Sequence, residues 1–371
     1  MTVAAGNRRP VLIMAGGTGG HVFPALAVAN ELTALGVPVS WLGTRQGLEA
    51  RVVPAAGYSL ATIRVSALRG KGLLRKFLAP VMLSLALWQT LMVFLRLRPA
   101  AVLGMGGFVA GPGGVTAWLL RRPLLIHEQN AIPGNTNRLL APLARRIMEG
   151  FPGSFPAGRH ALHTGNPVRA DIIALPSPEK RFTRRDAALR LLIVGGSLGA
   201  QALNKTVPDA ISRLPENERP LVHHQTGASG LTAVQASYRN VVSNARIEAF
   251  ISDMAAAYAW ADLVVCRAGA LTVAELAAAG VGSVLVPFPY AVDDHQTANA
   301  SYLVRAGAAI LVPQTELSAT ALAEILARFH NRRAALLDMA REARSLARPD
   351  AARQVAGLCL EAAGYPTGVA A

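Results

Sequence analysis

The feature that most constrains the fold is a unit that occurs twice, in which a short apolar run leads into glycines and then into a helical pattern. The first copy consists of the run Val11–Ala15, the loop Gly16–Gly20 and a helix that ends near Leu35. The second copy has the run 191–194 and the loop 195–199, followed by an alanine-rich helix. Because such units build parallel sheets with helices on both faces, the sequence predicts an α/β protein with two Rossmann-like domains whose parallel sheets face a cleft.

Other short apolar runs alternate with helical patterns in both halves and predict further strands of the same sheets. These runs lie at residues 37–42, 101–103, 124–127, 221–224, 245–250, 263–266 and 283–286. Residues 167–190 carry prolines and charges without periodicity and are expected to form a linker. We expect one domain at residues 1–166 and a second at 167–346, with a helix at about 347–365 that packs back on the first.

The composition narrows the class of protein. Of the 371 residues, 52% are apolar and 16% are charged, which excludes a disordered chain. The net charge of +15 favours an anionic partner, such as a phosphorylated ligand, an anionic membrane or a nucleic acid. Aromatic residues make up 5%, too few for an extensive base-stacking surface. The two cysteines, Cys266 and Cys359, exclude a disulfide scaffold and fit a reducing compartment.

One stretch challenges a water-soluble interpretation. Residues 77–95 carry no charge over a length near the lower limit for a membrane-spanning helix. Pro80 and Gln89 interrupt the stretch, and glycine motifs of one expected site lie on both sides of it. We therefore expect a buried or membrane-contacting helix. The N-terminus, whose short apolar run leads straight into glycines, does not resemble an export signal.

The first glycine loop is a candidate anion site. It lies between a strand and a helix, where unpaired backbone N–H groups and the helix dipole favour a phosphate. Val22 breaks the Gly-x-Gly-x-x-Gly spacing and no Gly-Lys-Ser/Thr follows, which disfavours a dinucleotide site or a P-loop. A turn needed only for packing is the alternative. His21, at the helix start, is a candidate neutral imidazole for catalysis or a structural residue.

Two other glycine-rich turns follow strands. Ser197, in the second loop, can donate to a phosphate or cap its helix. The turn Gly104–Gly114 permits either a close contact between its backbone and a ligand or a flexible connection. The sequence leaves both choices open.

Polar groups follow three further strands. His127–Asn130 lacks the spacing of a zinc motif because position 131 is alanine. Thr272 and Glu275 have capping-box spacing, while the Glu275 carboxylate is equally suited to accept from two ribose hydroxyls. Residues 293–299 form either a solvated loop or a sugar-binding rim. No cluster has metal-ligand spacing, so we expect neither a metal nor another cofactor.

The order of these motifs resembles the MurG family of bacterial enzymes, which is part of glycosyltransferase family 28. From about residue 10 to 310 the matching strings are Gly-Gly-Thr-Gly-Gly-His, Gly-Met-Gly-Gly-Phe, His-Glu-Gln-Asn, Gly-Asn-Pro-Val-Arg, Gly-Gly-Ser-x-Gly-Ala, Arg-Ala-Gly-Ala-Leu-Thr-Val-x-Glu and Gln-x-x-Asn-Ala. The resemblance implies the two-domain GT-B arrangement. It also implies inverting transfer of N-acetylglucosamine (GlcNAc) from UDP-GlcNAc to the C4 hydroxyl of the muramoyl residue of lipid I (undecaprenyl-diphospho-MurNAc-pentapeptide). The product, lipid II, serves peptidoglycan synthesis and hence cell shape and division.

The resemblance also assigns a site for the donor, with UDP-GlcNAc on the second domain and the acceptor and membrane on the first. Glu275 would hold the ribose, Ser197 and Arg169 the diphosphate, and backbone groups at Ile251 the uracil. The implied donor-binding residues are Thr18, Gly19, Gly20, Asn130, Arg169, Ser197, Ile251, Ala270, Leu271, Thr272, Val273, Ala274, Glu275 and Gln296.

The resemblance also bears on the sugar and on the chemistry. Asn130 and Gln296 would hold the sugar, although the rim around Gln296 matches the family loosely. Ala274 replaces a serine that is common in the family, which leaves backbone contacts unaffected. The acceptor hydroxyl must lose a proton as it attacks, and His21 is the first candidate for the base, with Glu128 second.

A lipid acceptor would explain the positive charge and the apolar run together. Basic and apolar residues adjoin at the start of the run, a combination suited to a membrane surface, and a solvated helix end is the alternative. The predicted membrane-contact residues are Lys71, Leu73, Leu74, Arg75, Lys76, Phe77 and Leu78. We expect a peripheral protein at the cytoplasmic face of the bacterial inner membrane. Its expected partners are UDP-GlcNAc, lipid I, the anionic membrane surface and other cell-wall synthesis proteins, but no nucleic acid.

Other functions remain open on the sequence alone. They are another GT-B lipid glycosyltransferase, a UDP-GlcNAc 2-epimerase, and a non-catalytic membrane subunit that binds a nucleotide sugar. The strings His127–Asn130 and Gly165–Arg169 favour the MurG family over the first two. A binding subunit needs only one intact glycine loop, whereas both halves keep theirs. Nucleic-acid binding has no supporting motif.

Overall fold

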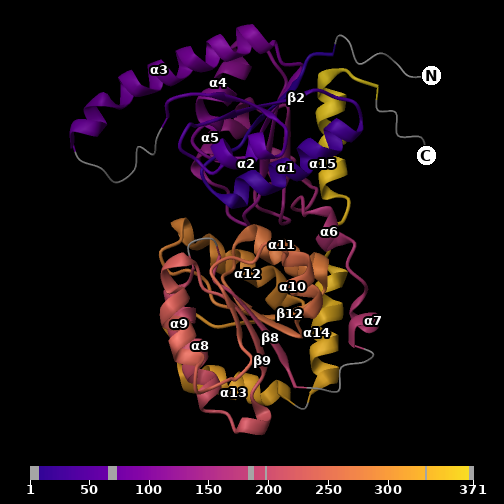
Figure 1. Ribbon diagram of the computed structural model, residues 1–371. Helices are drawn as coiled ribbons and strands as arrows, with labels where there is room; N and C mark the ends of the chain where they lie inside the picture. Colours follow the sequence, from indigo (N-terminus) through magenta and orange to yellow (C-terminus); the bar gives the residue numbers. More distant parts are fainter. Residues whose placement is uncertain (1–7, 66–72, 183–187, 197–198, 331, 367–371) are drawn as a thin grey trace. The chain divides into compact units, whose positions relative to one another are not determined.

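The chain folds into two compact α/β units. The computed structural model describes residues 8–65, 73–182, 188–196, 199–330 and 332–366. The first unit comprises residues 1–169 with 349–371, and the second comprises residues 170–348. Each contains one parallel sheet with helices on both faces (Figure 1). The predicted fold class, two Rossmann-like domains with parallel sheets, is confirmed.

The first unit contains a seven-stranded sheet in the order β3-β2-β1-β4-β5-β6-β7. Its strands are β1 (Val11–Met14), β2 (Val39–Gly43), β3 (Ser59–Thr62), β4 (Ala101–Gly104), β5 (Leu124–Glu128), β6 (Arg146–Glu149) and β7 (Leu162–His163). Its helices are α1 (Gly19–Ala34), α2 (Glu49–Ala55), α3 (Leu73–Leu97), α4 (Ala110–Leu119), α5 (Asn135–Leu140) and α15 (Ala351–Ala363), with 3₁₀ turns η1 (Ala141–Leu143) and η2 (Ala157–Arg159).

The second unit contains a six-stranded sheet in the order β10-β9-β8-β11-β12-β13. Its strands are β8 (Arg190–Val194), β9 (Leu221–Gln225), β10 (Arg246–Glu248), β11 (Leu263–Cys266), β12 (Gly282–Leu285) and β13 (Ala309–Leu311). Its helices are α6 (Ala170–Ile173), α7 (Pro178–Phe182), α8 (Gln201–Ser212), α9 (Leu231–Tyr238), α10 (Met254–Trp260), α11 (Ala270–Ala279), α12 (His295–Arg305), α13 (Ala319–His330) and α14 (Arg333–Ser345), with 3₁₀ turns η3 (Glu216–Glu218), η4 (Ala228–Gly230) and η5 (Val292–Asp294).

The two sheets share one topology, which places the glycine motifs. The strand order reverses between β1 and β4 in the first sheet and between β8 and β11 in the second. In doubly wound sheets, ligands bind beside the carboxyl ends of the strands at such a switch point. The turns that follow these four strands begin at Ala15, Met105, Gly195 and Arg267. Each predicted glycine motif therefore lies at a switch point.

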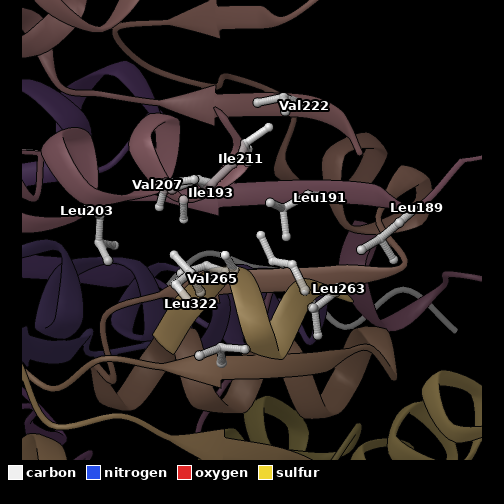
Figure 2. Close-up of a cluster of buried hydrophobic side chains, with 14 of the residues drawn as sticks. Leu189, Leu191, Ile193, Leu203, Val207, Ile211, Val222, Leu263, Val265 and Leu322 are labelled. Atoms are coloured by element: carbon white, nitrogen blue, oxygen red, sulfur yellow. The ribbon is translucent and has the colours of Figure 1, made fainter. Parts of the chain in front are cut away.

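The cores explain why the central strands are apolar throughout. Successive residues of a strand point to opposite faces, and both faces are covered here. In β1, Ile13 belongs to the core under α1 and α15, whereas Leu12 belongs to the core under α3 and α4. Figure 2 shows the corresponding core of the second unit, in which Ile193 of β8 and Val265 of β11 pack with side chains of α8 and α13.

The predicted linker is partly helical. Within residues 167–190, α6 and α7 are two short helices, and the described residues from 170 onwards belong to the second unit. The buried Arg181 of α7 donates to the backbone carbonyls of Tyr258, Ala279 and Gly280. These long-range bonds order a segment that has no apolar periodicity of its own.

The uncharged run 77–95 lies within α3, a helix that is long and apolar enough to cross a membrane by length and composition. One face of α3 is packed on the first unit, because Ala86, Thr90 and Phe94 are buried. Helix α3 therefore covers one side of the sheet, next to α4. Of the predicted membrane-contact residues, Lys71 lies outside the described residues, and the side chains of residues 73–78 are likewise not described.

Candidate active site

The first residues of α1 and its N-cap are exposed or half-buried, so a ligand can reach them. Thr18 is the N-cap of α1 in an extended conformation, and its carbonyl accepts from the N–H groups of His21 and Val22. Its hydroxyl makes no capping hydrogen bond. The hydroxyl and the N–H groups at Gly19 and Gly20 are therefore suited to an anionic or hydroxyl-bearing ligand, as predicted for this turn.

Glu49 lies beneath the first glycine loop and was missed by the sequence analysis. Its Oε2 accepts from the N–H of Gly17 at 3.0 Å, and its Oε1 accepts from the N–H and hydroxyl of Thr44 at 2.9 and 2.7 Å. Burial raises the pKa of Glu49, but the hydrogen bonds from Thr44 and Gly17 outweigh it and lower the pKa overall. The carboxylate thus fixes the loop and uses one of its N–H groups. Residues 18–20 are therefore the candidate anion-binding part of the loop.

The glycine turn after β4 packs directly on the first loop. A Cβ on Gly107 would lie 2.4 Å from the carbonyl oxygen of Gly16, and a Cβ on Gly106 would lie 3.0 Å from the imidazole of His21. Both glycines have positive φ, +82° and +100°. The turn Gly104–Gly114 is therefore not a loose connection. Its backbone packs on the first glycine loop and on the imidazole of His21.

Replacing Gly107 with alanine is expected to separate these turns, because the new Cβ would overlap the backbone carbonyl of Gly16 and not the movable end of a side chain. We expect a loss of stability of about 2–4 kcal/mol and a fall in turnover of more than about 10-fold. The matched control is Gly153→Ala in the same unit, since Gly153 has a φ of +80° but nothing within 4 Å of its Cβ position. Urea unfolding and steady-state kinetics of both variants give the comparison, and equal losses in the two would contradict it.

His21 is joined to a buried chain of polar groups at the end of β5. His21 Nδ1 lies 2.8 Å from Gln129 Oε1, and Gln129 Nε2 lies 3.0 Å from both His127 Nδ1 and the His127 carbonyl oxygen. His127 Nε2 lies 2.9 Å from the carbonyl oxygen of Gly165. His127 and Gln129 are both buried, so the Nδ1 side of the His21 imidazole is hydrogen-bonded to the interior of the first unit.

The buried His127 should make stability depend on pH. Burial lowers the pKa of His127 from 6.5 to about 4, which means that the unfolded chain binds a proton at a higher pH than the native one. The contribution of neutral His127 to the free energy of unfolding is therefore fully present above pH 6.5. It falls by on the order of 3 kcal/mol as the pH drops from 6.5 towards 4. We expect the urea midpoint to fall across this range. The fall should be smaller in His127→Gln, and identical pH curves for variant and wild type would contradict the expectation.

Glu128 is held by four hydrogen bonds and is only 1% exposed. Its Oε1 accepts from the N–H and Nδ2 of Asn130, and its Oε2 accepts from the N–H of Gly134 and Nδ2 of Asn137. A buried carboxylate that is fully occupied in this way orients its neighbours. The geometry therefore favours His21 over Glu128 as the base and makes Asn137, which was absent from the predicted site, part of the support for Asn130.

Two predicted phosphate ligands are less well defined by the structure. Ser197 lies outside the described residues. Arg169 is half-buried and is the last residue of the first unit before α6. Their assignment to the diphosphate stays a prediction.

A cavity of about 1260 Å³ lies at the switch point of the second unit. Its lining includes Gly195, Gly196, Arg267, Thr272 and Gln296. Arg267 is fixed by bonds to the carbonyls that follow β12 and to a glutamine side chain. The cavity therefore combines a glycine loop, a fixed cation and the first turn of α11, which suits a nucleotide-sized anionic ligand.

Helix α11 carries most of the predicted donor residues. It begins at Ala270 with Gly269 as the N-cap and without a side-chain capping bond, so the capping-box interpretation of Thr272 and Glu275 is wrong. Leu271, Thr272, Ala274 and Glu275 are half-buried, whereas Val273 is buried. The carboxylate of Glu275 accepts from the Tyr258 hydroxyl at 3.1 Å.

Gln296 and Ile251 complete the predicted donor residues of the second unit. The Oε1 of Gln296 accepts from the N–H groups of Ala268 at 3.3 Å and Phe288 at 2.9 Å, which fixes the side chain between two loops. The amide nitrogen of Gln296 has no hydrogen-bond partner among the described residues and can donate to a ligand. Ile251 lies in the loop after β10 with its side chain buried, so only its backbone is suited to bind a base.

Comparison with known proteins identifies relatives along almost the whole chain. The glycosyltransferase family 28 N-terminal domain matches residues 11–149, and the family 28 C-terminal domain matches residues 190–355. Proteins of Nitrosococcus oceani and Alkalilimnicola ehrlichii are 59% and 60% identical, over 95% of this chain and 98% and 99% of their own lengths. Both are named UDP-N-acetylglucosamine--N-acetylmuramyl-(pentapeptide) pyrophosphoryl-undecaprenol N-acetylglucosamine transferase. The crystal structure of Acinetobacter baumannii MurG is 43% identical, with a TM-score of 0.82 over 95% of this chain and 99% of that one.

Two Rossmann-like units with glycine turns at both switch points, together with these matches, define an enzyme of the GT-B glycosyltransferase class. Within that class, the chain belongs to the MurG family of glycosyltransferase family 28. The resemblance predicted from the order of the motifs is confirmed.

Proposed function

We propose that this enzyme transfers GlcNAc from UDP-GlcNAc to the C4 hydroxyl of the muramoyl residue of lipid I, with inversion, giving lipid II and UDP. The observation that carries the proposal is the 2.8 Å hydrogen bond between His21 Nδ1 and Gln129 Oε1 at the switch point of the first unit. Because an amide oxygen can only accept, Nδ1 is the donor, and Nε2 of the same ring is available to accept a proton. The names of the full-length relatives supply the two substrates.

The reaction divides between the units. His21 Nε2 takes the proton of the C4 hydroxyl as that oxygen bonds to the anomeric carbon and the bond from this carbon to UDP breaks. UDP leaves with its electron pair, and its growing charge is stabilised by the N-terminus of α11, by the second glycine loop and by Arg169. Glu275 holds the ribose, and Gln296 and Asn130 hold the sugar.

Product formation tests this function directly. The purified chain is incubated with UDP-GlcNAc and a short-chain lipid I analogue in the presence of EDTA, and the disaccharide product is detected by mass spectrometry. We expect product under chelation, since the proposed groups stabilise UDP without a metal. UDP-GlcNAc binding without product would refute the transferase and favour a binding subunit, and free sugar epimer instead of the disaccharide would favour an epimerase.

We further propose that α3 binds the cytoplasmic membrane surface. Five apolar side chains on α3, which we call the α3 stripe, follow each other at intervals of four and three residues and are between 40% and 66% exposed: Val81, Leu85, Trp88, Met92 and Leu95. At helical spacing they lie opposite the buried Ala86, Thr90 and Phe94. Helix α3 is therefore apolar on both faces, and its outer face needs a partner.

The surroundings of the α3 stripe suit an anionic membrane. Trp118 and Leu119 on the adjacent helix α4 are 54% and 63% exposed, and Arg96 and Arg98 near the end of α3 are exposed too. Apolar side chains at the acyl boundary with arginines at the headgroups are the features of a surface-bound helix. A membrane-bound acceptor then reaches the enzyme from the same surface.

Leu85→Glu should weaken this binding. Removal of one leucine from the lipid contact and addition of a charge are expected to lower the vesicle partition coefficient by about 10- to 100-fold. The matched control is Leu221→Glu in the second unit, where Leu221 is 37% exposed. Co-sedimentation with phosphatidylglycerol and with phosphatidylcholine vesicles separates the apolar from the charge contribution. Equal binding of Leu85→Glu and the control would refute the assignment.

A further inference from the structure

We propose that Gln129 is a positioning residue that holds His21 in the tautomer with its proton on Nδ1 and its lone pair on Nε2. The inference rests on the proposed function, because it takes Nε2 of His21 as the acceptor of the hydroxyl proton. The evidence is a chain of hydrogen bonds that runs from the carbonyl of Gly165 through His127 and Gln129 to His21. Two backbone carbonyls, which can only accept, determine which atom donates in each bond.

The orientation of the Gln129 amide follows from its partners. One of its terminal atoms lies 3.0 Å from the carbonyl oxygen of His127, and a carbonyl can only accept. That atom must therefore be the amide nitrogen. The amide oxygen is then the atom on the side of His21.

The tautomer of His127 supports the same orientation. Its Nε2 lies 2.9 Å from the carbonyl oxygen of Gly165 and must carry the proton. Burial lowers the pKa of His127 to about 4, so the ring is neutral near pH 7 and its Nδ1 accepts the second proton of the Gln129 amide nitrogen. Reversing the amide would place its oxygen against a lone pair and a carbonyl oxygen at once. The chain thus has one consistent direction.

His21 is the last residue of this hydrogen-bonded chain. The Oε1 of Gln129 only accepts, so Nδ1 of His21, 2.8 Å away, must donate. A neutral imidazole carries one proton, which leaves the lone pair on Nε2. The backbone of Gly106 lies against the ring, as a Cβ there would be 3.0 Å from Nδ1 and Cε1, and this contact limits rotation of the imidazole.

The same bond serves the reaction. When Nε2 takes the hydroxyl proton, the ring becomes an imidazolium that keeps its first proton on Nδ1, and the bond to the amide oxygen becomes charge-assisted. No proton passes on to Gln129, because an amide oxygen is not a base in this range. Among the described residues, Glu49, His127 and Glu128 bond to groups other than the ring of His21. Glu31 on the same helix, and Arg353, Cys359 and Glu361 on the packed helix α15, are likewise not bonded to the ring there.

The tautomer can be observed without activity. Histidine labelled with ¹⁵N in the ring gives different correlation patterns for Nδ1–H and Nε2–H rings, and the His21 signal is the one that is lost in His21→Ala. We expect the Nδ1–H pattern for His21 in the full-length wild-type chain at alkaline pH. An Nε2–H pattern in the wild type would overturn the proposal whatever the activity of the enzyme.

Two variants separate positioning from structure. Gln129→Met removes the bonds to His21 and to His127, and we expect the Nε2–H pattern and a kcat about 10- to 100-fold lower, with the KM for UDP-GlcNAc within about twofold. Gln129→Glu keeps an acceptor for Nδ1 but adds a charge that favours the imidazolium. We expect the Nδ1–H pattern to persist and the acid limb of the kcat–pH profile to move up by about one pH unit, which a merely structural residue would not cause.

The outcomes distinguish this proposal from the function on which it rests. Loss of turnover in His21→Ala with unchanged turnover in a Gln129→Met variant that has switched tautomer would overturn the positioning role alone. Full turnover in His21→Ala would overturn the role of the base, while the ¹⁵N pattern would still report whether Gln129 sets the tautomer. If Gln129→Met fails to fold, the wild-type pattern and the pH profile of Gln129→Glu decide.

Discussion

Replacing His21 with alanine will lower kcat by about 10²- to 10⁴-fold and leave the KM for UDP-GlcNAc within about threefold. The reason is that alanine removes the only proton acceptor proposed for the acceptor hydroxyl and leaves the donor residues of the second unit untouched. Steady-state kinetics with the lipid I analogue, followed by chromatography of the product, measure both constants.

The control for this prediction is His21→Gln, which keeps a polar side chain of similar reach at the start of α1 but provides no base. We expect it to be as slow as His21→Ala. Turnover of either variant within fivefold of the wild type, or recovery in the glutamine variant alone, would show that His21 orients the acceptor and does not take its proton.

Replacing Glu275 with alanine should mainly weaken donor binding. The carboxylate is proposed to accept from two ribose hydroxyls, and charged hydrogen bonds of this kind contribute about 1.5–3 kcal/mol each. We expect the KM for UDP-GlcNAc to rise by about 10²-fold with kcat lowered by less than about fivefold. Tyr258→Phe serves as the control, because it removes the bond on Oε2 and keeps the carboxylate, and it should change the KM little.

Deoxyribose donors make the test of Glu275 specific. The wild type should bind a 2′-deoxy analogue of UDP-GlcNAc more weakly than UDP-GlcNAc itself, whereas Glu275→Ala should bind the two nearly alike, because the lost partner is the same. Equal discrimination by the wild type and the variant would place the ribose elsewhere.

The central strands and the glycine loops of the site could be predicted from the sequence, because each is encoded by a few consecutive residues. Central strands such as β11 are continuous apolar runs, and the glycine loops follow them directly, so both are visible within a few residues. The missed strands β3, β6, β7 and β13 lie at or next to sheet edges. Polar residues replace part of the apolar pattern in the first three, and β13 is apolar but has only three residues.

The support of the site could not be predicted, because it comes from distant residues. Glu49 reaches Gly17 over a separation of 32 residues, and Gln129 reaches His21 over 108. No motif marks either contact before the fold brings them together. The capping-box error at Thr272 has a local cause: the helix begins two residues earlier, at Ala270, so the threonine lies inside the first turn.

The last helix gives the chain an unusual order of assembly during synthesis. Helix α15 packs on α1, and its Val355 and Cys359 are part of the core of the first unit. The second unit is contiguous in the chain and can complete its core without α15. The first unit, although it emerges earlier, has to wait with that apolar surface uncovered until residues 351–363 are released. A chaperone would therefore find its target in the N-terminal half of the nascent chain.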